Sequence, residues 1–195
     1  YREAGVEIEQ KIAGLLCSAI ISDTLLFRSP TCTSVDERAA RELAQIAGLD
    51  IEKYAVQMFS AGSNLKDKGD EEIFYQDFKR FTSGKVTFAV GQITSLDENE
   101  LKALKPRMLA YMQRSHETDN LNMIFFMLTN ILTESTDLIC VGQGAEQLVS
   151  TAFHMADEYG SGDEEMEEMD GIVSLPGVVS RKKQLAPQIM MALQQ

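Results

Sequence analysis

The chain has 195 residues and a formal net charge of −12, and 44% of its residues are hydrophobic while 25% are charged. This composition is typical of a globular protein, and the length fits one domain or one domain plus part of another. The excess of acid argues against nonspecific binding to nucleic acids and to anionic membrane surfaces, because both need a basic footprint. No apolar run in the sequence reaches the length that spans a bilayer.

Residues 6–27 follow a helical pattern that opens amphipathic and then becomes apolar on all sides. A helix of that kind must be covered on every face, so residues 14–33 are predicted to form a buried element. Ser29-Pro30 ends the pattern, because the residue before a proline is disfavoured in the α conformation. Two shorter helices are predicted at residues 35–47 and at residues 50 to about 59, and residues 61–64 are typical of a linker.

After this linker the sequence predicts strands that alternate with helices, which indicates an α/β layer structure. The run at residues 122–132, NMIFFMLTNIL, is continuously apolar and of strand length, so it is predicted to be a central strand buried on both faces. Further strands are expected at residues 78–81, 86–90, 137–141 and 172–174. Helices are expected at residues 70–76, 97–114, 145–155 and 180–193, with Pro106 as a kink or weak point of the second. Residues 160–170 are acidic and typical of a loop.

Asp23 is the single acid in the apolar run of residues 14–33. An ionised carboxylate is costly to bury unless it is paired or bound to a cation. The residues alone leave two interpretations open. Asp23 either accepts hydrogen bonds from a neighbouring backbone or capping group, or ligates a hard divalent cation such as Mn²⁺ or Mg²⁺, which favours carboxylate oxygen.

The segment Ser180-Arg181-Lys182-Lys183 is a basic block in an acidic half of the chain. No Lys or Arg occurs from residue 115 to residue 180, and then three follow in a row. Ser180 is a natural N-cap for the last helix, so Arg181 and Lys182 would lie in its first turn. Cations there oppose the helix dipole, which makes sense where the helix start binds an anion such as phosphate. A solvated basic turn is the alternative.

The cysteines predict a redox compartment. Cys17, Cys32 and Cys140 are odd in number, lie far apart in the sequence and form no CxxC pair. Free thiols in a reducing cytoplasm are therefore expected, and with them a cytoplasmic location.

Several motifs together resemble one family. IISDTLLFRSPTCT at residues 20–33 and VVSRKKQ at residues 178–184 are similar to the two C-terminal signatures of the family II, manganese-dependent inorganic pyrophosphatases of the DHH phosphoesterase superfamily. The segments AGLLCSAIISD, LAQIAGLD and Asp77-Phe78-Lys79 fall in the matching order. The family's N-terminal signatures, an HxDxD motif, a further Asp and the DHH triplet, would lie before Tyr1. The resemblance therefore implies the C-terminal part of a longer protein.

The resemblance also implies a domain organisation and a reaction. Residues 1–62 would be the last helices of an incomplete DHH domain, and residues 63–195 a small mixed-sheet α/β domain, the DHH-associated substrate-binding domain. The expected reaction is hydrolysis of pyrophosphate to two phosphates in the cleft between the domains, with residues 61–64 as the hinge. The cofactor would be Mn²⁺, with Mg²⁺ or Co²⁺ as alternatives, and the partners would be pyrophosphate and further copies of the chain.

Individual site residues follow from the same resemblance. Asp23 corresponds to a metal-ligand aspartate, whose further His and Asp partners would come from the missing signatures. Arg181, Lys182 and Lys79 correspond to the catalytic cations that bind substrate, with Ser180 beside them, whereas Lys183 is expected to face solvent. Because most metal ligands would be missing, this chain alone is expected to be nearly inactive.

Two alternatives remain open from the sequence. An exopolyphosphatase-like DHH phosphoesterase would act on a longer substrate, although SRKKQ at residues 180–184 argues against it. A non-catalytic module would bind phosphate or a partner through the basic block alone. The sequence does not decide whether a regulatory CBS insert exists.

Overall fold

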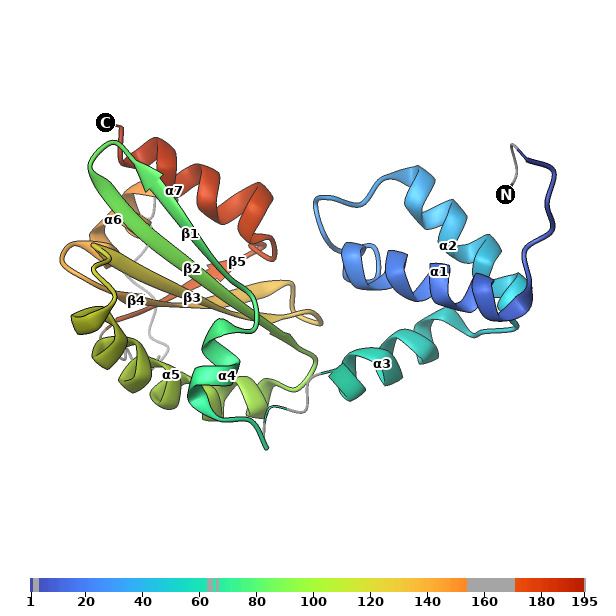
Figure 1. The fold of residues 1–195 in the computed structure, drawn as a ribbon, viewed down its shortest axis with the longest axis horizontal. Helices are drawn as coiled ribbons and strands as arrows, with labels where there is room; N and C mark the ends of the chain where they lie inside the picture. Colours follow the sequence, from blue (N-terminus) through green and yellow to red (C-terminus); the bar gives the residue numbers. More distant parts are fainter. Residues whose placement is uncertain (2–3, 63–64, 66, 154–170, 195) are drawn as a thin grey trace, which may run out of the picture. The chain divides into compact units, whose positions relative to one another are not determined.

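The computed structural model describes residues 1, 4–62, 65, 67–153 and 171–194. The chain divides into two compact units, which Figure 1 shows in ribbon form. The N-terminal unit is Tyr1–Asn64 and the C-terminal unit is Leu65–Gln195. Among the described residues, no helix combines the length and the apolar character needed to cross a membrane.

The N-terminal unit consists of helices α1 (Gln10–Thr24), α2 (Ser34–Ala47) and α3 (Ile51–Gly62). Its core is built largely from small side chains, which allows α1 and α2 to pack closely: Ala13, Cys17, Ile21, Ala40, Leu43, Ala44, Ala47, Ile51 and Ala55. Helix α2 begins in a capping box, in which the Thr33 hydroxyl accepts from Asp36 N and the Asp36 carboxylate accepts from Thr33 N. It ends at Gly48, whose φ of 69° is in the left-handed region that favours glycine.

The prediction that residues 14–33 form a buried element is wrong for this unit. Helix α1 buries only the stripe of Ala13, Cys17, Ile21 and Thr24, because the two other helices of this unit, mainly α2, cover one side of it. On the other side Leu15 is 69% exposed, and Asp23 is exposed as well. Helix α1 also stops earlier than the predicted end at residue 27.

The C-terminal unit is organised around a five-stranded sheet in the order β1-β2-β3-β4-β5. Strands β2 and β3 are parallel, and every other neighbouring pair is antiparallel. The mixed sheet that the resemblance implies is thereby confirmed. The strands are β1 (Phe78–Ser83), β2 (Val86–Ser95), β3 (Met123–Asn130), β4 (Ser135–Val141) and β5 (Ile172–Pro176), and helix α5 (Glu98–Thr118) makes the crossover between β2 and β3.

Helices cover both faces of this sheet (Figure 1). On the first face, α4 (Asp70–Tyr75) and α5 enclose a core that we call the α5-face cluster, which includes Phe74, Met108 and Phe126. On the second face, α6 (Ala145–Ala152) and the C-terminal helical segment enclose the α7-face cluster, which includes Val90, Phe125 and Met127. Strand β3 contributes to both clusters, as the apolar run at residues 122–132 predicts.

The C-terminal helical segment differs from the single helix that we predicted at residues 180–193. It begins as a π-helical turn, η2 (Arg181–Leu185), and continues as α7 (Ala186–Ala192). Pro187 lies in the first turn of α7, where its missing N–H is tolerated. Helix α5 runs four residues beyond its predicted end and includes Pro106. The acidic loop predicted at residues 160–170 lies outside the described residues. So do the last two residues of the helix predicted at residues 145–155.

Candidate functional site

Arg181, the first residue of the π-helical turn, binds the end of the sheet formed by β1 and β2. Its Nη1 donates to the carbonyl oxygens of Asp77 at 2.7 Å and of Val90 at 3.3 Å, and its Nη2 donates to Asp77 Oδ1 at 2.7 Å. Only 12% of the Arg181 side chain is exposed, against 49% of the Asp77 side chain. This contact joins the last helical segment to the first strands of the unit.

Lys79 lies close to the same contact. It is the second residue of β1 and stands directly opposite Val90, whose carbonyl oxygen binds Arg181. Opposite residues of an antiparallel pair share one face of the sheet, and Val90 belongs to the α7-face cluster. The exposed Lys79 side chain therefore leaves the sheet on the face that the π-helical turn covers. Lys79 and Arg181, predicted from separate motifs, come together at one end of the sheet.

Ser180 is the N-cap of the turn, as predicted, and its Oγ accepts from Lys183 N at 3.3 Å. The Ser180 carbonyl oxygen accepts from Gln184 N at 2.9 Å and from Leu185 N at 3.2 Å. The π-helical turn thus uses the N–H groups of three successive residues internally. Because these N–H groups are already bonded, an anion at this position would depend mainly on side chains, such as that of the exposed Lys182.

A row of polar side chains supports the backbone just before the turn. Gln92 of β2, Thr129 of β3 and Thr136 of β4 lie side by side on the α7 face, and we call them the polar ladder. Gln92 Nε2 donates to Thr129 Oγ1 at 3.3 Å, and Thr129 Oγ1 lies 2.9 Å from Thr136 Oγ1. The two threonines are fully buried. The ladder binds the two carbonyls that precede Ser180: those of Val178 and Val179.

Sequence reasoning missed Asp77 and the polar ladder. Asp77 appears in the matched motif only as the neighbour of Lys79, and nothing local shows that it pairs with a residue 104 positions away. The threonines lie in apolar strands, where a hydroxyl carries no periodic signal. The one sequence signal for the ladder is a polar residue within a run that is predicted to be buried, because a buried polar group needs a hydrogen-bond partner.

Asp23 lies in the N-terminal unit, near the end of α1, with its side chain exposed. The three residues after Thr24 have positive φ angles, of 48° at Leu25, 51° at Leu26 and 69° at Phe27. Non-glycine residues pay a steric cost in this region, and such strain is concentrated at functional sites. Within the described part of the chain, no group of three or more His, Cys, Asp or Glu residues could hold a metal ion. Asp23 can supply one carboxylate ligand, and one ligand does not make a Mn²⁺ site.

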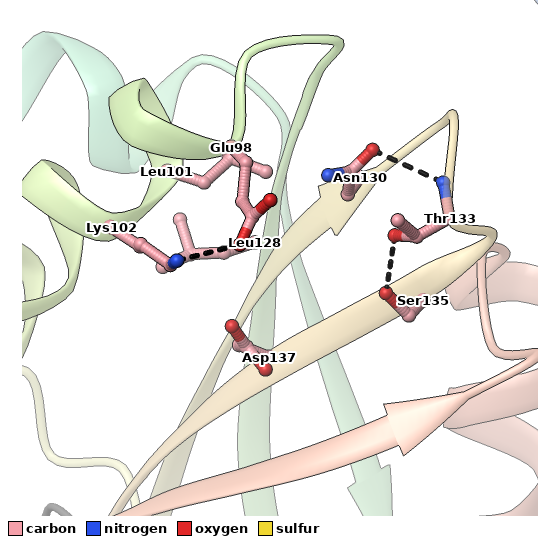
Figure 2. A pocket seen from close by; sticks show the side chains of 8 residues that line it. All are labelled: Glu98, Leu101, Lys102, Leu128, Asn130, Thr133, Ser135 and Asp137. Carbon is pink, nitrogen blue, oxygen red and sulfur yellow. Dashed lines mark hydrogen bonds and ion pairs between the residues drawn. The ribbon is translucent and has the colours of Figure 1, made fainter. Parts of the chain in front are cut away.

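A hollow lies on the α5 face of the sheet, with a volume of about 220 Å³. Figure 2 shows its lining, where Glu98 and Lys102 of α5 face Asn130, Thr133, Ser135 and Asp137 from β3, β4 and the turn between them. Lys102 Nζ lies 2.7 Å from Glu98, which raises the pKa of Lys102 and lowers the pKa of Glu98. Asp137 is held by Lys105 at 2.6 Å. Because each cation is matched by an acid, this hollow is a poor site for a highly charged anion.

Comparison with known proteins gives one family match and a set of close relatives. Residues 56–192 match the model of the DHHA2 domain. The chain is 42% identical, over 100% of its length, to a "Probable manganese-dependent inorganic pyrophosphatase" from Clostridium acetobutylicum, of which it covers 59%. It is 43% identical to a "Cobalt-dependent inorganic pyrophosphatase" from Clostridium perfringens, over 96% of the chain and 32% of that relative. The chain thus spans well under two thirds of each of these proteins.

A solved structure gives the same picture. The fold of the chain matches the crystal structure of a Methanococcus jannaschii protein, titled "putative family II inorganic pyrophosphatase", with a TM-score of 0.80 and 32% sequence identity. The match covers 97% of this chain and 58% of that protein.

Proposed function

The chain belongs to the DHHA2 domain family, and from this premise we propose that it is the substrate-binding part of a metal-dependent inorganic pyrophosphatase. The reaction is hydrolysis of pyrophosphate to two phosphates. The relatives that are named as manganese-dependent and cobalt-dependent pyrophosphatases support this proposal. Since the chain spans 59% of the first of them, the activity belongs to a protein with further ligands and not to this chain alone.

The observation that carries the proposal is the meeting of Lys79 with Arg181 and its neighbour Lys182. Val90 links the first two, because it stands opposite Lys79 and its carbonyl oxygen binds Arg181. Lys182 follows Arg181 directly and is exposed. Three cations gathered within an acidic chain form a local site for a polyanion, and pyrophosphate is a small one.

Each cation has a role in binding a phosphorylated substrate. Arg181 has five N–H donors, and its three hydrogen bonds to Asp77 and Val90 leave two for the phosphoryl oxygens that we expect it to bind. Lys79 and Lys182 act as point charges on longer, more flexible stems. Together they would offset the negative charge on the transferring and leaving phosphoryl groups. Because Asp77 and Val90 hold Arg181 before substrate arrives, little reorganisation is needed.

We assign to Asp23 the role of one ligand of the manganese ion. Bound Mn²⁺ would lower the pKa of a water molecule and so supply a nucleophile at neutral pH. The exposed carboxylate and the strained turn that follows it support the assignment. Asp23 needs further ligands, however, so we expect this chain alone to release phosphate at well under about one turnover per second.

Phosphate release from pyrophosphate tests the proposal directly. The full-length protein that carries this chain is assayed with Mn²⁺, with Mn²⁺ plus a chelator, and with long-chain polyphosphate in place of pyrophosphate. We expect rapid release that depends on the metal and prefers pyrophosphate, and a large loss in Asp23→Asn. Preference for polyphosphate would favour an exopolyphosphatase. Absence of release from either substrate would favour a non-catalytic phosphate-binding module.

We also propose a homo-oligomer in the cytoplasm. The three cysteines are free thiols, which is expected in a reducing compartment. On α1, the neighbouring residues Leu15 and Leu16 are 69% and 39% exposed, and exposed apolar surface of this kind can bind a second copy of the chain. A strictly monomeric species by light scattering at high concentration would contradict the oligomer.

A further inference from the structure

The polar ladder formed by Gln92, Thr129 and Thr136 lies where apolar side chains would be expected. The three residues are on the face that carries the α7-face cluster, among fully buried Phe88, Val90 and Leu138. Thr129 and Thr136 are fully buried too. A buried hydroxyl has to be hydrogen-bonded to be tolerated, so the ladder is expected to have partners that justify it.

Those partners are two backbone carbonyls. Thr136 Oγ1 donates to the carbonyl oxygen of Val178 at 2.5 Å, and Gln92 Nε2 donates to that of Val179 at 3.0 Å. Thr129 lies between the two and is bonded to both. The ladder, whose members come from three different strands, therefore binds two consecutive backbone carbonyls.

Gln184 binds the same segment as well. Its Oε1 accepts from Val179 N at 2.9 Å and from Ser180 N at 3.0 Å, and its Nε2 donates to the carbonyl oxygen of Gly177 at 2.7 Å. The backbone from residue 177 to residue 180 is thus bonded both to the polar ladder and to Gln184. Arg181 is the next residue, so its Cα has little freedom to move.

We propose that Gln92, Thr129 and Thr136 are positioning residues for Arg181 and Lys182. The inference rests on the proposed function, because it assigns the ladder to the binding of pyrophosphate. The ladder touches no substrate. It fixes the position of the backbone that leads into Arg181 and Lys182. A displacement of about 1 Å at such a position costs on the order of 10²-fold in rate.

The test uses the full-length protein with Mn²⁺ and pyrophosphate. Thr136→Val keeps the shape of the side chain and removes the hydroxyl, and Thr136→Ser restores the hydroxyl. We expect Thr136→Val to lower kcat/KM by about tenfold to 10²-fold, and Thr136→Ser to recover most of that loss. Ile139→Ala is the matched control, because Ile139 lies on the same strand, is fully buried and belongs to the opposite cluster.

Thermal unfolding is measured for each variant, and activities are compared at a temperature where all are folded. If the ladder positions Arg181, Ile139→Ala should lower stability at least as much as Thr136→Val does and yet keep kcat/KM near that of the wild type. It also predicts that Thr136→Val lowers kcat/KM less in an Arg181→Ala background than in the wild type, since part of its effect acts through Arg181. Equal loss of kcat/KM in Ile139→Ala, or full additivity with Arg181→Ala, would overturn the inference.

Gln92→Met provides an independent variant if Thr136→Val does not fold. Gln92 is only half-buried, and the change removes the donor to Val179 while keeping the length of the side chain. A loss of kcat/KM of about tenfold is expected, and wild-type kcat/KM would overturn the inference. A wild-type protein that releases no phosphate would instead overturn the proposed function and this inference with it.

Discussion

The guanidinium of Arg181 and the carboxylate of Asp77 form a close ion pair, with Nη2 and Oδ1 separated by 2.7 Å. The same guanidinium binds the backbone carbonyl oxygen of Asp77, also at 2.7 Å. Asp77 is two residues from Lys79, so the ion pair between Arg181 and Asp77 holds Arg181 beside β1, the strand that carries Lys79. An arginine held in this way contributes a preorganised charge and not a freely rotating one.

Removal of the Asp77 carboxylate should therefore damage catalysis without removing a substrate contact. We expect Asp77→Ala to lower kcat/KM for pyrophosphate by on the order of 10²-fold, and Asp77→Asn by less, because the amide oxygen can still accept from Arg181. Steady-state kinetics of the full-length protein measures both. Arg80→Ala is the control, because Arg80 directly follows Lys79 but does not contact Arg181. Among the described residues its only ion pair is a long one, with Asp119 at 3.9 Å. Wild-type kinetics in Asp77→Ala would contradict this role.

Gly91 should tolerate no side chain. A Cβ at this position would lie 2.5 Å and 2.7 Å from two ring carbons of Phe126, which is fully buried and stacked on Phe74. We expect Gly91→Ala to lower the free energy of unfolding by about 1–3 kcal/mol, the usual cost of overpacking. Urea unfolding measures the loss.

Gly14→Ala is the comparison for that experiment. Its new methyl group would meet only the Cβ of Ala47, at an ordinary 3.9 Å, and alanine favours the helix by up to about 1 kcal/mol. Equal destabilisation by the two substitutions would show that crowding against Phe126 is not the cause.

The capping box of α2 predicts an acid-dependent loss of stability. Hydrogen bonds from the Thr33 hydroxyl and backbone N–H lower the pKa of Asp36 below its ordinary value. The folded state therefore binds this proton less tightly than the unfolded state does. The resulting stabilisation is present above about pH 4, the ordinary carboxyl range, and is lost as the pH falls through the lower folded-state pKa. We expect the stability difference between wild type and Asp36→Asn to shrink between about pH 7 and about pH 3. An unchanged difference would argue against the capping box.

The thiols should differ in reactivity. Cys17 and Cys140 are buried while Cys32 is partly exposed, and burial strongly raises the pKa of Cys140. The pKa of Cys32 is raised too, by partial burial and by the nearby charges of Asp36 and Glu37, so accessibility of the thiol decides the rate. One thiol per chain should therefore react more rapidly than the others with a disulfide reagent under native conditions, and all three should react after unfolding. Cys32→Ser should abolish the rapid phase. Rapid labelling of Cys140 would contradict its burial.

The elements with strong local patterns could be predicted from the sequence. The unbroken apolar run of β3 indicates burial on two faces, and the N-cap at Ser180 follows from its place before a helical pattern. The burial of α1 could not be predicted, because an apolar helix does not show which stripe its neighbours cover. Of the predicted site, Lys79, Ser180 and Arg181 fall near one another in the C-terminal unit. The bonds that position them join strands and turns far apart in the chain, and no local pattern carries that information.

A comparison of Arg181→Ala with Lys183→Ala tests the central claim most directly. Both substitutions remove one positive charge from the same basic block, but only Arg181 is bound to Asp77 and Val90. In the full-length protein with Mn²⁺, Arg181→Ala should lower kcat/KM for pyrophosphate by on the order of 10²-fold or more, the usual loss for one preorganised donor. Arg181→Lys should recover only part of this, since it restores the charge without the fork. Lys183→Ala should stay within a few-fold of the wild type. Equal losses in Arg181→Ala and Lys183→Ala, or no loss in either, would contradict the account.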